Sequence, residues 1–246
     1  MDILSIGNSF SQDAQRYLHR IAQSDDFTLN SFNLFIGGCS LQQHYRNMCS
    51  DEKAYTLEMN GESTDFLVSL KEALTNRPWD VITLQQVSQQ SPDYHSFQPY
   101  LDELTDYVRR TVPNAKIAIH QTWAYHRDNH VMREHLGFAD HHQMLSKVVE
   151  AYQEAAEHIG ADYLIPSGEV MGALLKSGIQ NVHRDMLHAS NGLGRFALGL
   201  TWYTILTGRS IEKIALCRFD EEITPEEQAI AKACVTRICQ KYRKLL

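Results

Sequence analysis

The segment SIGNSFSQD, residues 5–13, lies close to the first residue of the sequence and joins a short apolar run to a polar turn. The run Ile3–Ile6 has the length of a buried strand, and Gly7 ends it. Asn8 and Ser9 follow at once, so a small hydroxyl group stands at the carboxyl end of the predicted strand. Because ligands of open α/β sheets bind at the carboxyl ends of strands, Ser9 is the first candidate for a functional residue.

Four further runs rich in β-branched and aromatic residues have the length of strands: Phe27–Ile36, Val81–Leu84, Ile117–His120 and Tyr163–Ile165. Between them, apolar residues recur at helical spacing in three segments: Phe66, Leu67, Leu70 and Leu74; Leu101, Leu104 and Val108; and Met144, Leu145, Val148, Val149 and Tyr152. Strands that alternate with helices form βαβ units, whose strands are parallel and whose helices cover the sheet. The sequence therefore predicts an α/β fold with a mostly parallel, five-stranded sheet between helices.

No internal repeat, low-complexity tract or linker divides the chain, so we expect residues 1–246 to form a single domain. The last helix is predicted to start at Pro225, because Thr224 is a good N-cap and Glu227 completes a capping box. The apolar segment LGRFALGLTWYTILTG, residues 193–208, predicts a buried helix whose last glycine is its C-cap. Such a helix would anchor the loop that precedes it.

The formal net charge is −7 at pH 7 and the pI is about 5.9, which disfavours nucleic acid as a partner because phosphate binding needs a basic face. No stretch approaches the ~18 consecutive apolar residues of a membrane-spanning helix. The first residues lack a basic region followed by an apolar one, so we expect a cytoplasmic protein, or a secreted one if residues before Met1 have been removed. The five cysteines form no Cys-x-x-Cys pair, which favours reduced thiols.

The loops after the predicted strands are the candidate functional site. Ser9 follows the first strand, GGCS (residues 37–40) follows the second, and QQVSQQS (residues 85–91) follows the third. Gly37 and Gly38 leave their backbone N–H groups uncovered, so a ligand can approach them closely. Because the strands are parallel, these loops should lie side by side at one edge of the sheet.

The segment HRDMLHASNGLGRF, residues 183–196, supplies an acid and a base. A serine hydroxyl becomes a nucleophile when a histidine takes its proton, and a carboxylate orients that histidine. Asp185 and His188 stand three residues apart, and His183 is a rival base with a different spacing from Asp185. Together with Ser9 they predict nucleophilic catalysis. A serine after a strand is also a common helix N-cap, which is the structural alternative for Ser9.

Four blocks of the sequence resemble the SGNH (GDSL-like) hydrolase superfamily: IGNSFS near the start, GGCS after the second strand, the polar loop after the third, and RDMLH late in the chain. They look most like a bacterial branch of unknown function whose first block reads Gly-Asn-Ser-Phe-Ser. The resemblance extends from Gly7 to His188 and implies a flavodoxin-like, three-layer α/β/α fold and ester hydrolysis by a serine. It places the nucleophile at Ser9, the triad aspartate at Asp185 and the base at His188.

The resemblance also implies an oxyanion hole, which is a set of donors that stabilises the charged intermediate. Its glycine falls on Gly37 or Gly38, and the backbone N–H of Ser9 is a further donor. The third block of the superfamily ordinarily reads Gly-x-Asn-Asp, whereas this loop has neither glycine nor asparagine. Gln86 is the expected replacement donor, since a primary amide offers the same group on a longer stem, and Ser88 is the second choice.

Asn8 stands where the superfamily usually has aspartate, which keeps a hydrogen-bonding side chain without its charge. We expect Asn8, Ser88 and Trp123 to contact the substrate, although an aromatic residue at a strand end is also commonly a core residue. No long apolar lid is visible, which favours a small, acetyl-like acyl group on a polar body such as a carbohydrate. The sequence therefore predicts an esterase of small-molecule substrates without metal or cofactor. A catalytically inactive module that binds a glycan or small molecule is the alternative.

Histidines are frequent between His120 and His142. His126 and His130 are four residues apart, so a helix would place both on one face, as a metal-assisted hydrolase requires. The stretch lacks the glutamate of an HExxH pattern, which favours a solvated loop with scattered histidines. Cys39, inside the second block, is expected to be a buried neutral thiol rather than a reactive one.

Overall fold

The first strand, β1 (Asp2–Gly7), lies in the middle of a seven-stranded sheet with the order β4-β3-β2-β1-β5-β6-β7. The structure is a computed structural model that describes residues 1–242. The other strands are β2 (Asn30–Phe35), β3 (Tyr55–Met59), β4 (Glu62–Val68), β5 (Val81–Leu84), β6 (Lys116–His120) and β7 (Tyr163–Ile165). β2, β1, β5, β6 and β7 are mutually parallel, which confirms the five predicted strands, although β2 is shorter than expected.

The two additional strands, β3 and β4, form an antiparallel hairpin at one edge of the sheet. Asn60 and Gly61 have positive φ angles of 54° and 83°, which suit the tight turn between two antiparallel strands. Phe66 and Leu67 therefore lie in β4, and not in the helix that their spacing predicts. That helix, α4 (Leu70–Thr75), begins only after the strand has ended. The five-stranded prediction is thus corrected to a mixed sheet of seven strands.

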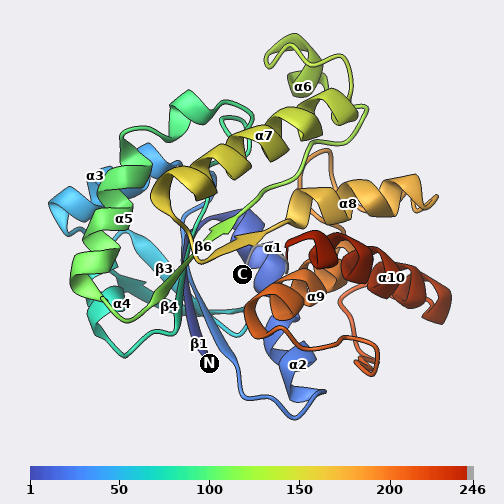
Figure 1. Cartoon of the computed structure of the whole chain (residues 1–246), viewed down its shortest axis with the longest axis horizontal. Coiled ribbons are helices and arrows are strands. Elements are labelled where there is room, and N and C mark those ends of the chain that lie inside the picture. The colour runs from blue at the N-terminus through green and yellow to red at the C-terminus, as the bar shows by residue number, and fades with distance from the viewer. Residues whose placement is uncertain (243–246) are drawn as a thin grey trace.

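Two layers of helices cover the two faces of the sheet (Figure 1). One layer contains α1 (Ser9–Gln15), α2 (Leu18–Gln23), α8 (Ser167–Lys176), α9 (Leu193–Thr207) and α10 (Pro225–Tyr242). The other contains α3 (Leu41–Ser50), α4, α5 (Tyr100–Thr111), α6 (His130–Glu134) and α7 (His141–Ile159). Alternate residues of β1 enter the two cores, since Ile3 packs with the first layer and Leu4 with the second.

The two C-terminal helices have the predicted ends. α9 is buried along nearly its whole length, and Gly208 is its C-cap with a φ of 70°. The N–H of Glu227 donates to Thr224 Oγ1 (3.2 Å), and the N–H of Thr224 donates to Glu227 Oε2 (2.7 Å), which is the expected capping box. Among residues 1–242 we find no helix with the length and hydropathy that a bilayer-spanning segment needs.

Candidate active site

The turn between β1 and α1 is built around Asn8, which is the N-cap of the helix. Asn8 Oδ1 accepts a hydrogen bond from the N–H of Phe10 (3.0 Å), and Ser11 Oγ accepts one from the N–H of Asn8 (3.0 Å). A Cβ atom at Gly7 would lie 2.0 Å from Ser11 Oγ, so this approach requires glycine. Since Asn8 is the cap, Ser9 is free of that role and becomes the first residue of α1, half-buried at the carboxyl end of β1.

His188 joins Ser9 to Asp185 by two hydrogen bonds. Its Nε2 lies 2.9 Å from Ser9 Oγ, and its Nδ1 lies 2.9 Å from Asp185 Oδ2. Asp185 Oδ1 also accepts the backbone N–H groups of Leu187 (2.7 Å) and His188 (2.6 Å), which closes residues 185–188 into a tight turn. The fold thus brings together a hydroxyl and an imidazole that are 179 residues apart in the chain.

The carboxyl of Asp185 is ionised at neutral pH. Burial by itself would raise its pKa, but hydrogen bonds from the backbone and ring of His188 and from the N–H of Leu187 outweigh burial and lower the pKa to about 2. A carboxylate at Nδ1 favours the imidazole tautomer that carries its proton there. The other nitrogen, Nε2, then faces Ser9 Oγ as a proton acceptor.

A pocket of about 390 Å³ opens beside Ser9 and His188. Its lining comes from four turns: Asn8, Ser9, Phe10 and Gln12; Gly37 and Gly38; Val87, Ser88 and Gln89; and Arg184, Leu187 and His188. Gly38 has a positive φ of 64°, and a Cβ there would meet no atom within 4 Å, so its backbone is open on this side. The N–H of Ser9 belongs to the first turn of a helix and has no carbonyl within α1 to accept it. Backbone of the Ser9 turn and of the glycine turn therefore lines the same pocket.

Gln86 does not reach this pocket, although the sequence predicts it as an oxyanion donor. Its side chain is fully buried, and Nε2 donates to the backbone oxygen of Ser96 (2.8 Å). Its Oε1 accepts the N–H groups of Leu41 (3.0 Å) and Val87 (2.9 Å). The amide therefore links three segments of the second helix layer and is not available to a ligand, which corrects the prediction.

Ser88 lines the pocket, whereas Trp123 does not. The hydroxyl of Ser88 lies 3.0 Å from the hydroxyl of Tyr125, a buried residue. Trp123 is completely buried and stacks on Phe10 with ring centroids 4.0 Å apart, while its Nε1 donates to the backbone oxygen of Leu187 (2.9 Å). Trp123 thus supports two pocket residues from the core, and the prediction that it contacts a substrate is wrong.

Asp13, one turn after Ser9 on α1, is a buried residue that sequence reasoning missed. Its carboxylate accepts hydrogen bonds from Arg184 Nη1 (2.8 Å), Arg195 Nε (2.9 Å) and the N–H of Ala189 (3.1 Å). The same Arg184 nitrogen donates to the backbone oxygen of Ala189 (2.7 Å). Asp13 therefore ties the helix that carries Ser9 to residues on both sides of Asp185 and His188. The sequence of α1, SFSQDAQ, is mostly polar, so nothing in it marks Asp13 as buried.

His183, the rival base, is turned away from Ser9. Its Nε2 lies 3.2 Å from the backbone oxygen of Ala124, and burial lowers the pKa of its ring to about 4. Cys39 is buried behind the glycines, and burial raises the pKa of its thiol to about 12, so the expected neutral thiol is found. Its backbone oxygen accepts a hydrogen bond from Asn8 Nδ2 (3.0 Å), which holds the glycine turn beside β1.

The spacing of His126 and His130 does not place the two rings on one helix face. His130 begins the short helix α6, whereas His126 turns toward His183 with ring centroids 5.8 Å apart. Within residues 1–242, no group of three or more His, Cys, Asp or Glu side chains is arranged to hold a metal ion. The histidine-rich segment instead contributes to a second pocket, which is described below.

The model of a domain of unknown function, DUF4886, matches residues 2–236 of this sequence. The chain belongs to the DUF4886 family. A DUF4886 family protein from Bacteroides uniformis ATCC 8492 is 32% identical, with 98% of this chain and 95% of that chain covered and a TM-score of 0.91. No curated protein matches the sequence.

Two more distant structures share the fold of this DUF4886 protein. A putative SGNH hydrolase from Slackia heliotrinireducens is 21% identical, covers 84% of this chain and 98% of its own, and has a TM-score of 0.59. A family 3 carbohydrate esterase from Clostridium thermocellum is 13% identical, with 83% of this chain and 94% of that chain covered, and has a TM-score of 0.50. At these identities the likeness concerns the fold, in agreement with the predicted three-layer architecture.

Proposed function

We propose that this DUF4886 protein is a serine esterase of the SGNH type. The observation that carries the proposal is the chain of two 2.9 Å hydrogen bonds from Ser9 Oγ through His188 to Asp185, at the edge of a pocket with open backbone donors. This combination contains the nucleophile, the base, the orienting carboxylate and the oxyanion donors that acyl transfer requires. The resemblance of the four sequence blocks to SGNH hydrolases assigns the same three residues to the same roles.

In the proposed mechanism, Ser9 Oγ attacks the carbonyl carbon of the ester while His188 Nε2 takes the hydroxyl proton. Asp185 stabilises the imidazolium that forms. The tetrahedral intermediate then collapses, and His188 donates the proton to the leaving alcohol, which leaves an acyl group on Ser9. Water attacks this acyl-enzyme with His188 as the base, and the carboxylic acid departs as the Ser9 hydroxyl is restored.

The oxyanion donors in this proposal are backbone groups. The N–H of Ser9 and an N–H of the glycine turn, at Gly37 or Gly38, flank the position where a carbonyl oxygen would lie beside the hydroxyl. Gln86 is excluded, because its amide is committed to Ser96 and to two backbone N–H groups. Ser88, the second choice, lines the pocket and is the third-block side chain that remains for this role.

The proposed substrate is a small acyl ester of a polar molecule such as a carbohydrate. The wall formed by Val87 and Leu187 beside the two glycines suits a short acyl group. Gln12, Gln89 and Arg184 line the same pocket and offer hydrogen-bonding groups to a polar alcohol portion. Long acyl chains would find no apolar groove along this lining.

The test is a panel of acetylated sugars and nitrophenyl esters of increasing chain length, assayed with the wild type and with Ser9→Ala. We expect acetyl esters to react fastest and Ser9→Ala to lose at least about a thousandfold in kcat/KM. Ser146→Ala, at an exposed serine of α7, should leave the activity unchanged. Undiminished turnover by Ser9→Ala would refute the assignment.

A binding module without catalysis is the second candidate, and it is favoured by the amide of Gln86, the first-choice oxyanion donor, which is committed to other groups of the protein. A fluorophosphonate probe separates the two functions, since it reacts with an activated serine and leaves an inert one unmodified. Labelling of the wild type that is absent in Ser9→Ala supports the esterase. No labelling, together with saturable binding of acetylated sugars, supports the binding module.

A further inference from the structure

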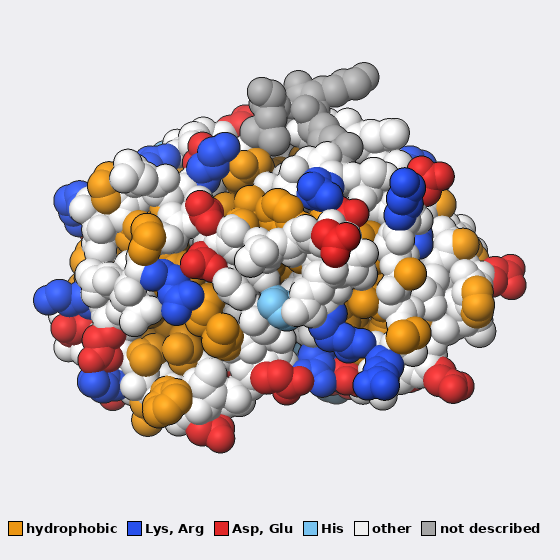
Figure 2. Space-filling view, turned by 90° about the horizontal axis from the view of Figure 1, so that it is seen from below, with side chains coloured by type: hydrophobic (Ala, Val, Ile, Leu, Met, Phe, Trp, Pro, Cys, Tyr) orange, Lys and Arg blue, Asp and Glu red, His pale blue; other side chains and the backbone are white. Residues whose placement is uncertain are grey.

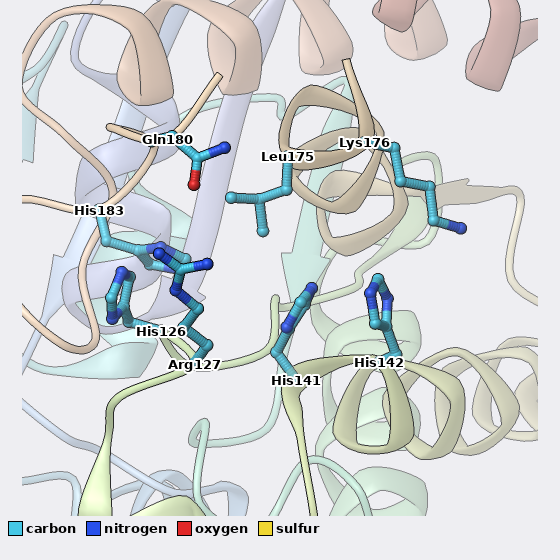
Figure 3. A pocket seen from close by; sticks show the side chains of 8 residues that line it. All are labelled: His126, Arg127, His141, His142, Leu175, Lys176, Gln180 and His183. Carbon is cyan, nitrogen blue, oxygen red and sulfur yellow. The ribbon is translucent and has the colours of Figure 1, made fainter. Parts of the chain in front are cut away.

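A second pocket, of about 150 Å³, shares no lining residue with the pocket beside Ser9 (Figure 3). We call it the histidine pocket, because four of its lining residues are histidines. His126 comes from the loop after β6, His141 and His142 from the first turn of α7, and His183 from the loop after α8. Its volume is on the order of ten times the roughly 15 Å³ that one water molecule needs, so it has room for a small polyatomic ligand.

Two permanent cations line the same pocket. Arg127 follows His126, and Figure 3 shows its guanidinium beside the rings of His126 and His183. Lys176, the last residue of α8, lies at the other end of the pocket near His142, with its ammonium directed away from the rings. Both side chains are exposed. Neither has an ion pair with any residue in the described part of the chain. Because both cations are exposed, solvent screens their charges, but two unpaired cations at the rim still favour an anion over a metal cation in the pocket.

The carboxylates near the pocket are already engaged. Asp140 caps α7 by accepting the N–H groups of His142 and Gln143 (both 2.9 Å), and Asp185 is bound to His188. Asp128 is exposed and lies 3.6 Å from His126 Nδ1 on the same loop. None of the three lines the pocket, so the positive groups there have no carboxylate of this chain among them.

Two ring nitrogens of the pocket lack hydrogen-bond partners, although buried polar atoms nearly always have one. They are His183 Nδ1 and His141 Nε2. His183 is only 7% exposed, and its Nε2 is paired with the backbone oxygen of Ala124 (3.2 Å). Since Nε2 is the donor in that bond, Nδ1 can donate to a ligand only if the ring takes up a second proton.

We propose that the histidine pocket binds a small oxyanion such as phosphate or a carboxylate, held by Arg127 and Lys176 and by the rings of His141 and His183. Once the rings are doubly protonated, an oxyanion supplies the acceptors that their N–H groups need, and the unpaired cations at the rim attract it. A metal cation would satisfy the ring nitrogens too, but the guanidinium and ammonium groups repel it. This proposal is independent of the esterase activity.

The pH dependence of binding distinguishes an anion from a metal ion in this pocket. Burial lowers the pKa of His141, and the positive charges of His142, His126 and Arg127 lower it further. Asp140 opposes this effect at His141, and Asp185 opposes it at His183. A bound anion would reverse the repulsion and raise the pKa of both rings, so binding takes up protons and becomes tighter as the pH falls. Metal binding has the opposite dependence, because a metal competes with protons for the rings.

The test is calorimetric titration of the whole chain with sodium phosphate against sodium chloride at equal ionic strength, at pH 6 and pH 8. We expect one saturable site, tighter at pH 6. The double variant Arg127→Gln, Lys176→Gln should weaken it by about tenfold or more. The matched control, Arg110→Gln, Lys71→Gln, removes one exposed arginine and one exposed lysine on α5 and α4 and should bind phosphate like the wild type.

Histidine ring NMR signals of the wild type provide a second measurement that needs no variant, because phosphate should shift the rings of the pocket and chloride should not. The proposal is overturned if no phosphate site is found, if both double variants bind phosphate equally well, or if binding tightens from pH 6 to pH 8. Saturable binding of Zn²⁺ alone, tighter at pH 8, would replace the anion with a metal.

Discussion

Asn8 shows how one side chain positions several parts of the site. Besides capping α1, it accepts a hydrogen bond from Gln85 Nε2 (2.7 Å) and donates to the backbone oxygen of Cys39 (3.0 Å). The turns after β1, β2 and β5 therefore meet at one amide, which is 1% exposed. Asn8 lines the pocket, but its polar atoms are used within the protein, so its role is to position the turns.

Asn8→Ala should destabilise the protein more than the loss of an ordinary cap. We expect about 1 kcal/mol from the cap and at least about 1 kcal/mol more from the unpaired groups of Gln85 and Cys39. Ser40→Ala is the matched control, because Ser40 caps α3 through a single bond to Gln43 (3.2 Å). Urea denaturation measures both variants, and equal losses would show that the additional bonds of Asn8 contribute nothing.

The lowered pKa of Asp185 predicts a pH-dependent contribution to stability. Because the pKa falls from its usual 3.8 to about 2 in the folded chain, the contribution is complete at neutral pH and disappears as the pH falls from about 5 to about 2. Asp185→Asn should therefore be less stable than the wild type at pH 7, with the difference reduced to roughly half at pH 3 and nearly gone at about pH 2. Urea denaturation at several pH values measures the difference, and a gap that widens in acid would contradict the prediction.

For single residues, the sequence predicts the members of the proposed triad better than the residues that position them. The order of the blocks indicated that Ser9, Asp185 and His188 would meet, and the structure places them in contact. The prediction of Gln86 as an oxyanion donor failed because successive side chains after a strand point to opposite sides. The amino-acid types alone do not reveal which side holds the pocket. The prediction that Trp123 contacts the substrate failed because a large ring at a strand end is equally suited to the core.

Among the elements, α1 and the segment 183–189 depend on each other through Asp13. A buried carboxylate with two guanidinium partners is costly to disrupt, because removing its charge leaves the partners uncompensated. This pairing was not predictable, since the three residues are separated by 171 and 182 positions in the chain.

Asp13→Asn should reduce both stability, by about 3 kcal/mol, and the rate of fluorophosphonate labelling at a temperature where the variant is folded. Asp220→Asn is the matched control: Asp220 also pairs with Arg195 (3.0 Å), but it makes no bond to residues 184–189. The control should lose stability and keep the labelling rate. Equal labelling by wild type and Asp13→Asn would show that Asp13 only stabilises the fold.

The β3–β4 hairpin shows why a helical spacing can mislead. Phe66 and Leu67 are 70% and 59% exposed, so their spacing does not reflect packing against a core. The local signal for a hairpin is the tight turn at Asn60 and Gly61. Hydrophobic periodicity predicts structure only where one face is buried.

Phe66→Thr should accordingly change the free energy of unfolding by no more than about 0.5 kcal/mol. Leu70→Ala, at the buried start of α4, should cost about 3 kcal/mol, although both residues belong to the same predicted helix. Chemical denaturation of the two variants compares them directly. A large loss for Phe66→Thr would mean that the exposed edge is packed against something in solution.

For the whole molecule, the alternation of strands and helices was sufficient to predict the three layers, because each βαβ unit is local in sequence. The first and last thirds of the chain are brought together by α9, which packs closely against α2. A Cβ atom at Gly199 of α9 would lie 2.8 Å from Cδ1 of Ile21 in α2. The surface agrees with the charge balance, since acidic and basic side chains are interspersed on the face drawn in Figure 2 and form no continuous basic field there.

The segment 183–189 is held to its neighbours largely by polar groups, including the carboxylate of Asp13 and the bonds that His126 N–H (3.1 Å) and Asn129 Nδ2 (2.9 Å) donate to the backbone oxygen of Met186. Concentrated salt screens ion pairs and leaves apolar burial intact or stronger. Asp13 is buried, however, where screening is weak, and the bonds to Met186 join uncharged groups. In brine His188 should therefore keep its alignment, so that any turnover persists up to the temperature at which the sheet unfolds.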